Sequence, residues 1–262
     1  MEVNNTMKNS RKCSIFLGAA LFTLCLGCQS VNQPTPSPQS YNVKTSPGNL
    51  NIKPQNVVQN IEKSINAPKQ LEIIQINAEG IFVDSSKKDW NKVDSRMNLI
   101  KTNYNELKPL MQMATSSKDL IKNMGVAIDN LDKQIKAKKV YETRFDSNQL
   151  TKYIPDAYGH FKSSVNTDIL RMSYHVREIE LNADQAQWKS AKTNLDSIER
   201  IWPSTKAKIN STYSKDIAAL ETIFHDTNKS ITAKNADMTR NNAKKMLDGI
   251  IVIKSNLDKQ SI

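Results

Sequence analysis

His175 and Glu178 are the residues of this 262-residue chain whose types and spacing best suit metal binding. They begin and end the sequence His-Val-Arg-Glu, and this spacing places both side chains on one face of a helix. Imidazole and carboxylate groups both bind transition metals, but a metal site needs more than two donors. We therefore treat His175 and Glu178 as a candidate metal pair, with a polar helix face as the alternative interpretation.

Enzyme chemistry finds little support elsewhere in the chain. His160 stands beside Phe161 and His225 beside Asp226, and an isolated histidine on a helix is usually a surface or partly buried residue. The chain has no glycine-rich phosphate loop, no Gly-x-Ser-x-Gly and no His-Glu-x-x-His. Its carboxylates are scattered over polar faces, with no pair fixed in a loop for acid–base work. We expect no enzyme activity, no catalytic residue and no cofactor.

The three cysteines are Cys13, Cys25 and Cys28, and the last two belong to the sequence Leu24-Cys25-Leu26-Gly27-Cys28. This sequence resembles the lipobox of bacterial lipoproteins, in which signal peptidase II cuts before a cysteine that carries lipid. The family usually has Leu, Val or Ile where this chain has Cys25. The resemblance implies that residues 1–27 are a signal peptide and that Cys28 carries lipid such as palmitate. No cysteine follows Cys28, so we expect neither a disulfide nor a thiolate ligand in the mature chain.

The residues before Cys28 have the composition of an export signal. Lys8, Arg11 and Lys12 form a positive segment, and residues 15–26 form an apolar run shorter than the roughly 20 residues that a membrane span needs. An uncleaved anchor and an ordinary secretory signal remain the alternatives. Because two or more acyl chains hold a protein firmly on a bilayer, we expect this chain to be lipid-anchored on the extracytoplasmic face of the cell membrane.

Residues 28–55 comprise the expected lipidated cysteine and a proline-rich linker. Prolines alternate there with Ser, Thr, Asn and Gln, and apolar residues are sparse. Such a segment cannot bury enough apolar surface to offset the entropy of ordering it. The prolines are Pro34, Pro36, Pro38, Pro47 and Pro54.

The rest of the chain repeats itself. Apolar residues spaced three and four apart recur 98 residues later: Trp90, Val93, Met97, Ile100, Tyr104 and Leu107 are followed by Trp188, Ala191, Leu195, Ile198, Trp202 and Thr205. The triplet Ser117–Asp119 recurs as Ser214–Asp216, and later matches lie 96 residues apart. We infer a tandem duplication of two units, residues 67–163 and 164–260.

The spacing of the apolar residues predicts helices and no strands, so the fold class is all-α. Each unit reads as a roughly four-helix antiparallel bundle behind the flexible N-terminal tether. The expected helices span 67–83, 86–112, 116–138 and 147–163 in the first unit, and 165–182, 184–211, 213–233 and 237–259 in the second. Polar residues indicate helix starts at Asp84–Ser86, Thr115–Ser117 and Asp146–Ser147. Pro109 and Pro203 should kink their helices without ending them.

The connection between the two units allows two arrangements. A helix that continues through residues 163–168 would join the bundles end to end. Alternatively, Asn166-Thr167-Asp168 would cap a new helix and let the second unit fold back.

The His-x-x-Glu sequence of His175 and Glu178 is similar to that of imelysin-like periplasmic proteins, which are also duplicated helical bundles and are linked to iron uptake. The resemblance covers one tetrapeptide and the general architecture. It implies a role as a metal or iron-uptake accessory protein. The equivalent positions of the first unit hold Asn77 and Gly80, so the pair does not belong to the shared framework.

The chain carries a formal net charge of +11, with 37 Lys and Arg against 26 Asp and Glu. Basic surfaces attract polyanions through fields that salt screens. The expected export argues against nucleic acid, which leaves anionic envelope polymers and phospholipid as candidate polyanions. A solvated basic surface with no dedicated partner is the alternative interpretation of the charge. We therefore expect a non-enzymatic binding or scaffold module of the cell envelope that binds a protein partner or an anionic wall polymer, with the iron-uptake role as the alternative and the oligomeric state open.

Overall fold

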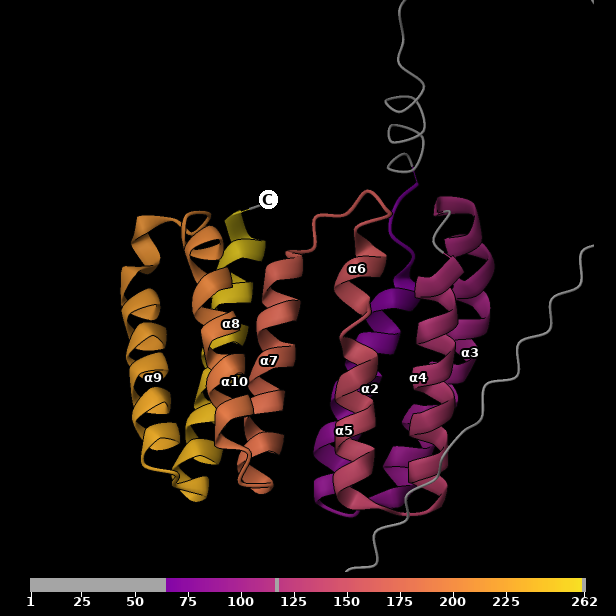
Figure 1. The fold of residues 1–262 in the computed structure, drawn as a ribbon. Helices are drawn as coiled ribbons and strands as arrows, with labels where there is room; N and C mark the ends of the chain where they lie inside the picture. Colours follow the sequence, from indigo (N-terminus) through magenta and orange to yellow (C-terminus); the bar gives the residue numbers. More distant parts are fainter. Residues whose placement is uncertain (1–64, 116–117, 261–262) are drawn as a thin grey trace, which may run out of the picture. The chain divides into compact units, whose positions relative to one another are not determined.

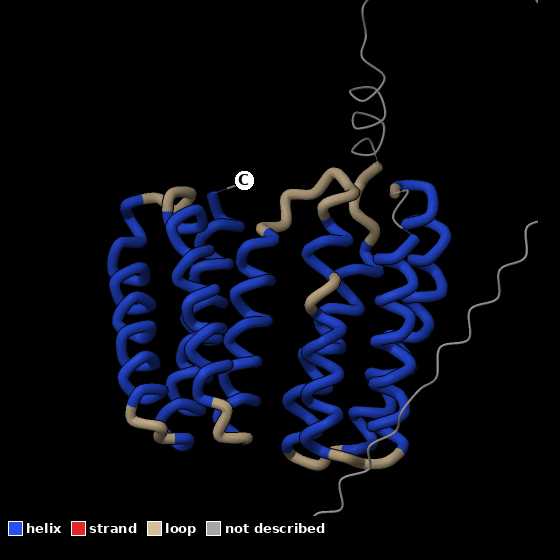
Figure 2. The backbone as a smooth tube through the Cα atoms, in the orientation of Figure 1, coloured by secondary structure: helices blue, strands red, loops and turns tan. Residues whose placement is uncertain are grey.

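The computed structural model describes residues 65–115 and 118–260, and Figure 1 shows them as a set of helices. Within these residues there is no β-strand, and a single isolated bridge pairs Asn66 with Lys162. Figure 2 shows the same backbone as helices joined by short loops. The all-α prediction is confirmed. All described residues lie in one compact unit of the chain.

The first helix group comprises α2 to α6. Helix α2 contacts α3 and α5, while α4 contacts α3 and α5, so these four helices close a ring around one core. The short helix α6 lies against α2 and α5. The bounds are Lys69–Ser86 for α2, Trp90–Ala114 for α3, Lys118–Lys136 for α4, Val140–Thr151 for α5 and Ile154–Tyr158 for α6.

The second helix group comprises α7 to α10 and repeats this arrangement. Helix α7 contacts α8 and α10, and α9 contacts the same two helices. The bounds are Thr167–Asp184 for α7, Trp188–Lys206 for α8, Ser214–Thr232 for α9 and Ala236–Gln260 for α10, with a 3₁₀ turn η1 at Ser211–Tyr213 before α9.

Each helix group buries an apolar core of its own. In the first, Met97, Ile100 and Leu107 of α3 are at most 2% exposed, as the spacing of the apolar residues predicts. In the second, Leu195 and Ile198 of α8 are fully buried. Each such side chain contributes about 1.5–3 kcal/mol of burial free energy. The helical stripes are too narrow to be buried alone, so four of them share each core.

Four non-glycine residues with positive φ end helices in both groups. Lys88 and Ala186 follow α2 and α7, and Lys138 and Lys234 follow α4 and α9, with φ between 50° and 56°. At each, the next backbone N–H donates to the carbonyl five residues back, as from Asp89 to the Asp84 carbonyl at 3.0 Å. These are Schellman motifs, which satisfy the last carbonyls of a helix. They permit a three-residue turn, so consecutive helices run antiparallel.

These turns explain why two predicted helix starts are wrong. Asp84 and the two serines after it form the last turn of α2, and α3 starts later, where Asp89 accepts from the Lys92 N–H at 3.3 Å. Asp146 and Ser147 lie inside α5, which starts at Val140 because the positive-φ turn comes first.

The other predicted helix boundaries have different outcomes. Thr115 ends α3, and the other two residues of that predicted cap lie outside the described residues. Both α3 and α8 continue past the internal Pro109 and Pro203, as predicted. Asn166 caps a new helix, accepting from the Asp168 N–H at 3.1 Å, so a helix does not run continuously from one group into the other.

Candidate functional site

A pocket with a volume of about 970 Å³ lies between α3 and α4. Its rim carries Lys101 and Lys108 from α3, and Lys118 and Lys122 from α4. On a helix, residues four or seven apart share a face, so each pair projects toward the same groove. We call this site, defined by the four lysines, the basic groove.

The floor of the basic groove depends on Tyr104 and Gly125. The Tyr104 hydroxyl donates to the Ile121 carbonyl of α4 at 2.6 Å, which fixes the ring across the gap between the helices. A Cβ at position 125 would lie 2.8 Å from that hydroxyl oxygen, so a larger residue there would have to displace the end of the Tyr104 side chain. Burial, and then the charge of Asp129, raise the pKa of Tyr104, so the hydroxyl remains a neutral donor.

The positive charge of the basic groove is only partly neutralised. Lys101 pairs with Asp132 of α4 at 2.5 Å. Burial opposes ionisation of Asp132, but the hydrogen bonds from Lys101 and Lys136 outweigh it and hold its pKa below the ordinary value. Among residues 65–115 and 118–260, no ion pair involves Lys108, Lys118 or Lys122.

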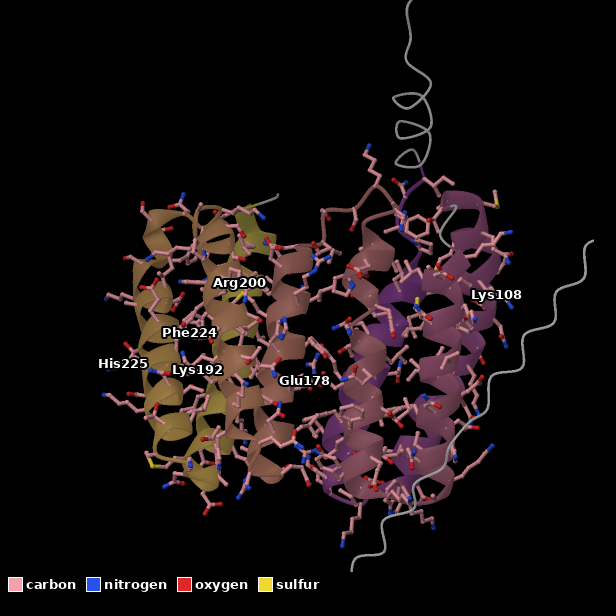
Figure 3. All side chains as sticks on the ribbon, in the orientation of Figure 1. Lys108, Glu178, Lys192, Arg200, Phe224 and His225 are labelled. Carbon is pink, nitrogen blue, oxygen red and sulfur yellow. The ribbon has the colours of Figure 1, made fainter. Side chains whose placement is uncertain are left out.

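All three of these lysines are exposed, and Lys108 is labelled on α3 in Figure 3. The lining contributes one carboxylate, Asp129, and apolar surface from Ile121 and Val126. The groove therefore combines unneutralised ammonium groups with an apolar floor, an arrangement that can hold a flexible anion.

A second polar cluster, the junction, joins the two helix groups. Arg144 of α5 has a side chain that is 9% exposed and donates to Glu180 and, at 2.7 Å, to Asp184 of α7. Its guanidinium lies 4.5 Å from the ring centroid of Phe82. Arg240 of α10 contacts the other oxygen of Asp184 at 3.0 Å. The junction thus holds two carboxylates between two guanidinium groups.

Glu178 belongs to the same junction. Its carboxylate accepts from the side-chain amides of Asn148 at 2.8 Å and Gln149 at 2.9 Å, both on α5. Arg177, whose side chain is 5% exposed, donates to the Asn148 side-chain oxygen at 2.7 Å and pairs with Glu79 of α2 at 3.1 Å. Burial raises the pKa of Glu178, and the two amide hydrogen bonds only partly oppose this. The face of α7 that carries Glu178 therefore packs against α5 of the first helix group.

His175 faces a different helix from Glu178. Its Nδ1 lies 2.8 Å from the Asn194 side-chain oxygen on α8, and its ring meets Tyr174 edge to face at 5.1 Å. Burial lowers the pKa of His175, which favours the neutral ring. Glu178, labelled on α7 in Figure 3, instead contacts α5. The structure keeps the two predicted metal ligands on one helix but gives each a separate partner.

The other candidate residues do not form a cluster in the described part of the chain. In the described part of the chain, no group of three or more His, Cys, Asp or Glu side chains could hold a metal ion. His160 lies 3.4 Å from the Thr115 hydroxyl at one end of the first helix group. Of the aromatic residues in the repeated apolar series, Trp202 is 5% exposed, whereas Trp90 and Tyr104 are only partly buried.

The predicted lipidation site Cys28, the signal peptide at 1–27 and the linker at 28–55 lie outside the described residues. Within the described residues, no helix combines the length and the apolar character that crossing a membrane requires.

Comparison with protein-family models, with curated proteins and with solved structures finds no match to this chain. The imelysin-like and lipoprotein resemblances therefore stay predictions from the sequence.

Sequence reasoning missed the basic groove because its four lysines come from two helices and form no run. Lys101 and Lys108 share a helix face by their spacing, which was one available signal. Gly125 was the other, because a glycine inside a helix costs about 1 kcal/mol relative to alanine and so calls for a packing or functional reason.

Proposed function

We propose that this chain is a lipid-anchored, non-enzymatic binding module on the outer face of a bacterial membrane, and that its basic groove binds an anionic phosphodiester polymer of the envelope. The observation that carries the proposal is the set of three exposed lysines, Lys108, Lys118 and Lys122, that face one groove without an ion pair in the described residues. The lipobox resemblance at Cys28 supports the location.

The chemistry of the basic groove favours a polymer of repeated single charges. Lysine is a flexible point charge, whereas recognition of one compact, doubly charged group usually uses the rigid fork of arginine. The apolar floor of Tyr104, Ile121 and Val126 suits the carbon segments between successive phosphates. Screened attraction of this kind gives affinity that falls steeply with salt.

We also propose that the two helix groups arose by tandem duplication of a four-helix unit, residues 67–163 and 164–260. The closed order of contacts in each group supports this, as do the Schellman turns, which recur at the 98- and 96-residue offsets of the sequence repeat. The duplication supplied two copies of the α3–α4 corner, of which one carries the basic groove.

The test is binding of the full-length protein to poly(glycerol phosphate), measured by calorimetry over a salt series. Replacing Lys108, Lys118 and Lys122 by glutamine should weaken binding at least tenfold. It should also reduce the slope of log affinity against log salt by roughly 2–3, since each phosphate that a lysine neutralises adds about 0.7–0.9 to that slope.

The matched control removes three exposed lysines elsewhere, through Lys189→Gln, Lys215→Gln and Lys245→Gln on α8, α9 and α10. It has the same net charge as the groove variant and should bind within threefold of the wild type. Equal weakening in the two variants would show binding by general surface charge and would overturn the role of the groove. Binding to phosphatidylglycerol vesicles but not to the polymer would overturn the choice of ligand.

A further inference from the structure

The second helix group carries a carboxylate at the position where the first has its basic groove. Glu221 of α9 accepts at one oxygen from the indole N–H of Trp202, at 2.8 Å, and from the ammonium group of Lys206, at 2.7 Å. Trp202 and Lys206 both come from α8. The hydrogen bonds from Lys206 and then Trp202 lower the pKa of Glu221, so the carboxylate stays charged.

The two corners can be matched residue by residue from the Schellman turns. Tyr104 and Lys108 follow Lys88 by the same number of residues as Trp202 and Lys206 follow Ala186. The aromatic residue and the lysine of α8 therefore have direct counterparts on α3.

Counting back from the turns that end α4 and α9 matches the other wall. Gly125 precedes Lys138 by the same number of residues as Glu221 precedes Lys234, and both helices run without interruption between. Glycine therefore stands where the second group has its carboxylate. The register also places Lys118 opposite Ser214, so the similar triplets at the starts of these helices lie one position apart.

The same register shows how the charge of the corner changes between the groups. Lys118 and Lys122 correspond to Ser214 and Ala218, which are neutral. Lys101 corresponds to Glu199 by the count from Lys88 and Ala186, so the first group has three additional ammonium groups and lacks the carboxylate that pairs with the equivalent of Lys108. In the second group, the equivalent lysine is already occupied by an internal anion.

We propose that one phosphate of the bound polymer replaces this missing carboxylate as the partner of the Lys108 ammonium, beside the Tyr104 hydroxyl that covers Gly125, as the Glu221 carboxylate pairs with Lys206. Lys122, one helical turn before Gly125, flanks the same subsite. The Tyr104 hydroxyl already donates to the Ile121 carbonyl, so the ring forms a wall of the subsite. This inference rests on the proposed function and assigns its primary anion subsite.

The test places a carboxylate in the first group at position 125, which corresponds to Glu221 of the second group. In the full-length protein, Gly125→Glu should place a carboxylate within reach of Lys108 and compete with the polymer phosphate. Gly125→Gln has nearly the same size and meets the same Tyr104 hydroxyl, but it carries no charge. Both changes replace glycine with a better helix former, and thermal melts check that both variants fold.

We expect Gly125→Glu to bind poly(glycerol phosphate) at least tenfold more weakly than Gly125→Gln at low salt. This difference should shrink to less than threefold when both variants also carry Lys108→Gln, because the carboxylate then has no ammonium group to occupy. Equal binding by the Glu and Gln variants would overturn the subsite. So would a Glu–Gln difference that persists without Lys108, since the new charge would then act through the general field.

The result separates this inference from the proposal beneath it. Failure of the wild-type protein to bind the polymer at low salt would overturn the proposed function itself. Binding by the wild type, with no distinction between the Glu and Gln variants, would overturn only the subsite.

Discussion

Replacing Arg144 by leucine tests whether the junction stabilises the chain. The change leaves Glu180 without its guanidinium partner, while Asp184 keeps Arg240 at 3.0 Å. Breaking a buried ion pair by removing one partner typically costs 3–5 kcal/mol, because the other charge is left desolvated. Since one carboxylate keeps a partner and leucine still packs on Phe82, we expect the lower end, about 3 kcal/mol. A domain with about 5–15 kcal/mol of stability should still fold.

The measurement is urea denaturation of the wild type and of Arg144→Leu at pH 7.5 and pH 5. Burial raises the pKa of Glu180, and the charge of Arg144 opposes this. Without Arg144 that pKa rises further, so protonation removes the stranded charge as the pH falls. The destabilisation should therefore be smaller at pH 5 than at pH 7.5.

The matched control is Arg171→Leu. Arg171 also bridges the two helix groups, to Asp156 at 2.7 Å, but both side chains of that pair are at least 40% exposed. An exposed pair contributes about 0–1 kcal/mol, so this variant should change little. The role of the junction is contradicted if the free energy of unfolding of Arg144→Leu lies within about 0.5 kcal/mol of the wild-type value. It is also contradicted if Arg144→Leu is no less stable than Arg171→Leu.

Two further predictions concern the residues that the sequence first singled out. Burial raises the folded-state pKa of Glu178 above its unfolded value. At pH values between the two, the folded chain binds more protons than the unfolded chain, so stability falls as the pH rises through this range. The free energy of unfolding of Glu178→Gln, relative to that of the wild type, should therefore be higher at pH 7.5 than at pH 4.5. A difference in urea midpoints that does not change with pH would contradict this. For the metal interpretation, the His175→Ala, Glu178→Ala double variant should retain the iron and zinc content of the wild type by mass spectrometry, because the two side chains have separate partners; loss of one metal equivalent would establish the site.

The periodicity of apolar residues was enough to predict most of the helices and their buried faces, but the helix expected at 147–163 is divided between α5 and α6 and ends at Tyr158. Val93, Met97 and Ile100 are buried as their spacing requires, since burial of a stripe is what the helix period encodes. The helix ends were less accessible because they depend on backbone geometry. A lysine or alanine with positive φ has no composition signal comparable to glycine, so the turns at Lys88 and Ala186 could not be placed from the sequence.

The sites were harder to predict than the helices because they form across helices. Arg144 and Glu180 are far apart in sequence, and each alone reads as an exposed charge. Only the antiparallel packing of α5 on α7 brings them together. The sequence similarly offered His175 and Glu178 as one pair, whereas the packing of α7 between α5 and α8 divides them between two neighbours.

The separation of core and junction bears on how the chain could bind a polymer. Each helix group buries an apolar core that comes almost entirely from its own helices, and Leu170 of α7 is the side chain that packs into the core of the other group. The junction adds charged side chains to this contact. The Lys206–Glu221 pair places a carboxylate in the α8–α9 corner, whereas the α3–α4 corner is an open basic groove. If the groove of the first helix group is the polymer site, the second helix group adds no avidity to it. Tight retention of a long polymer would then require many lipid-anchored copies of the chain on one membrane, each binding a different segment of the polymer. Linked weak sites increase the overall affinity when the geometry lets them bind at once.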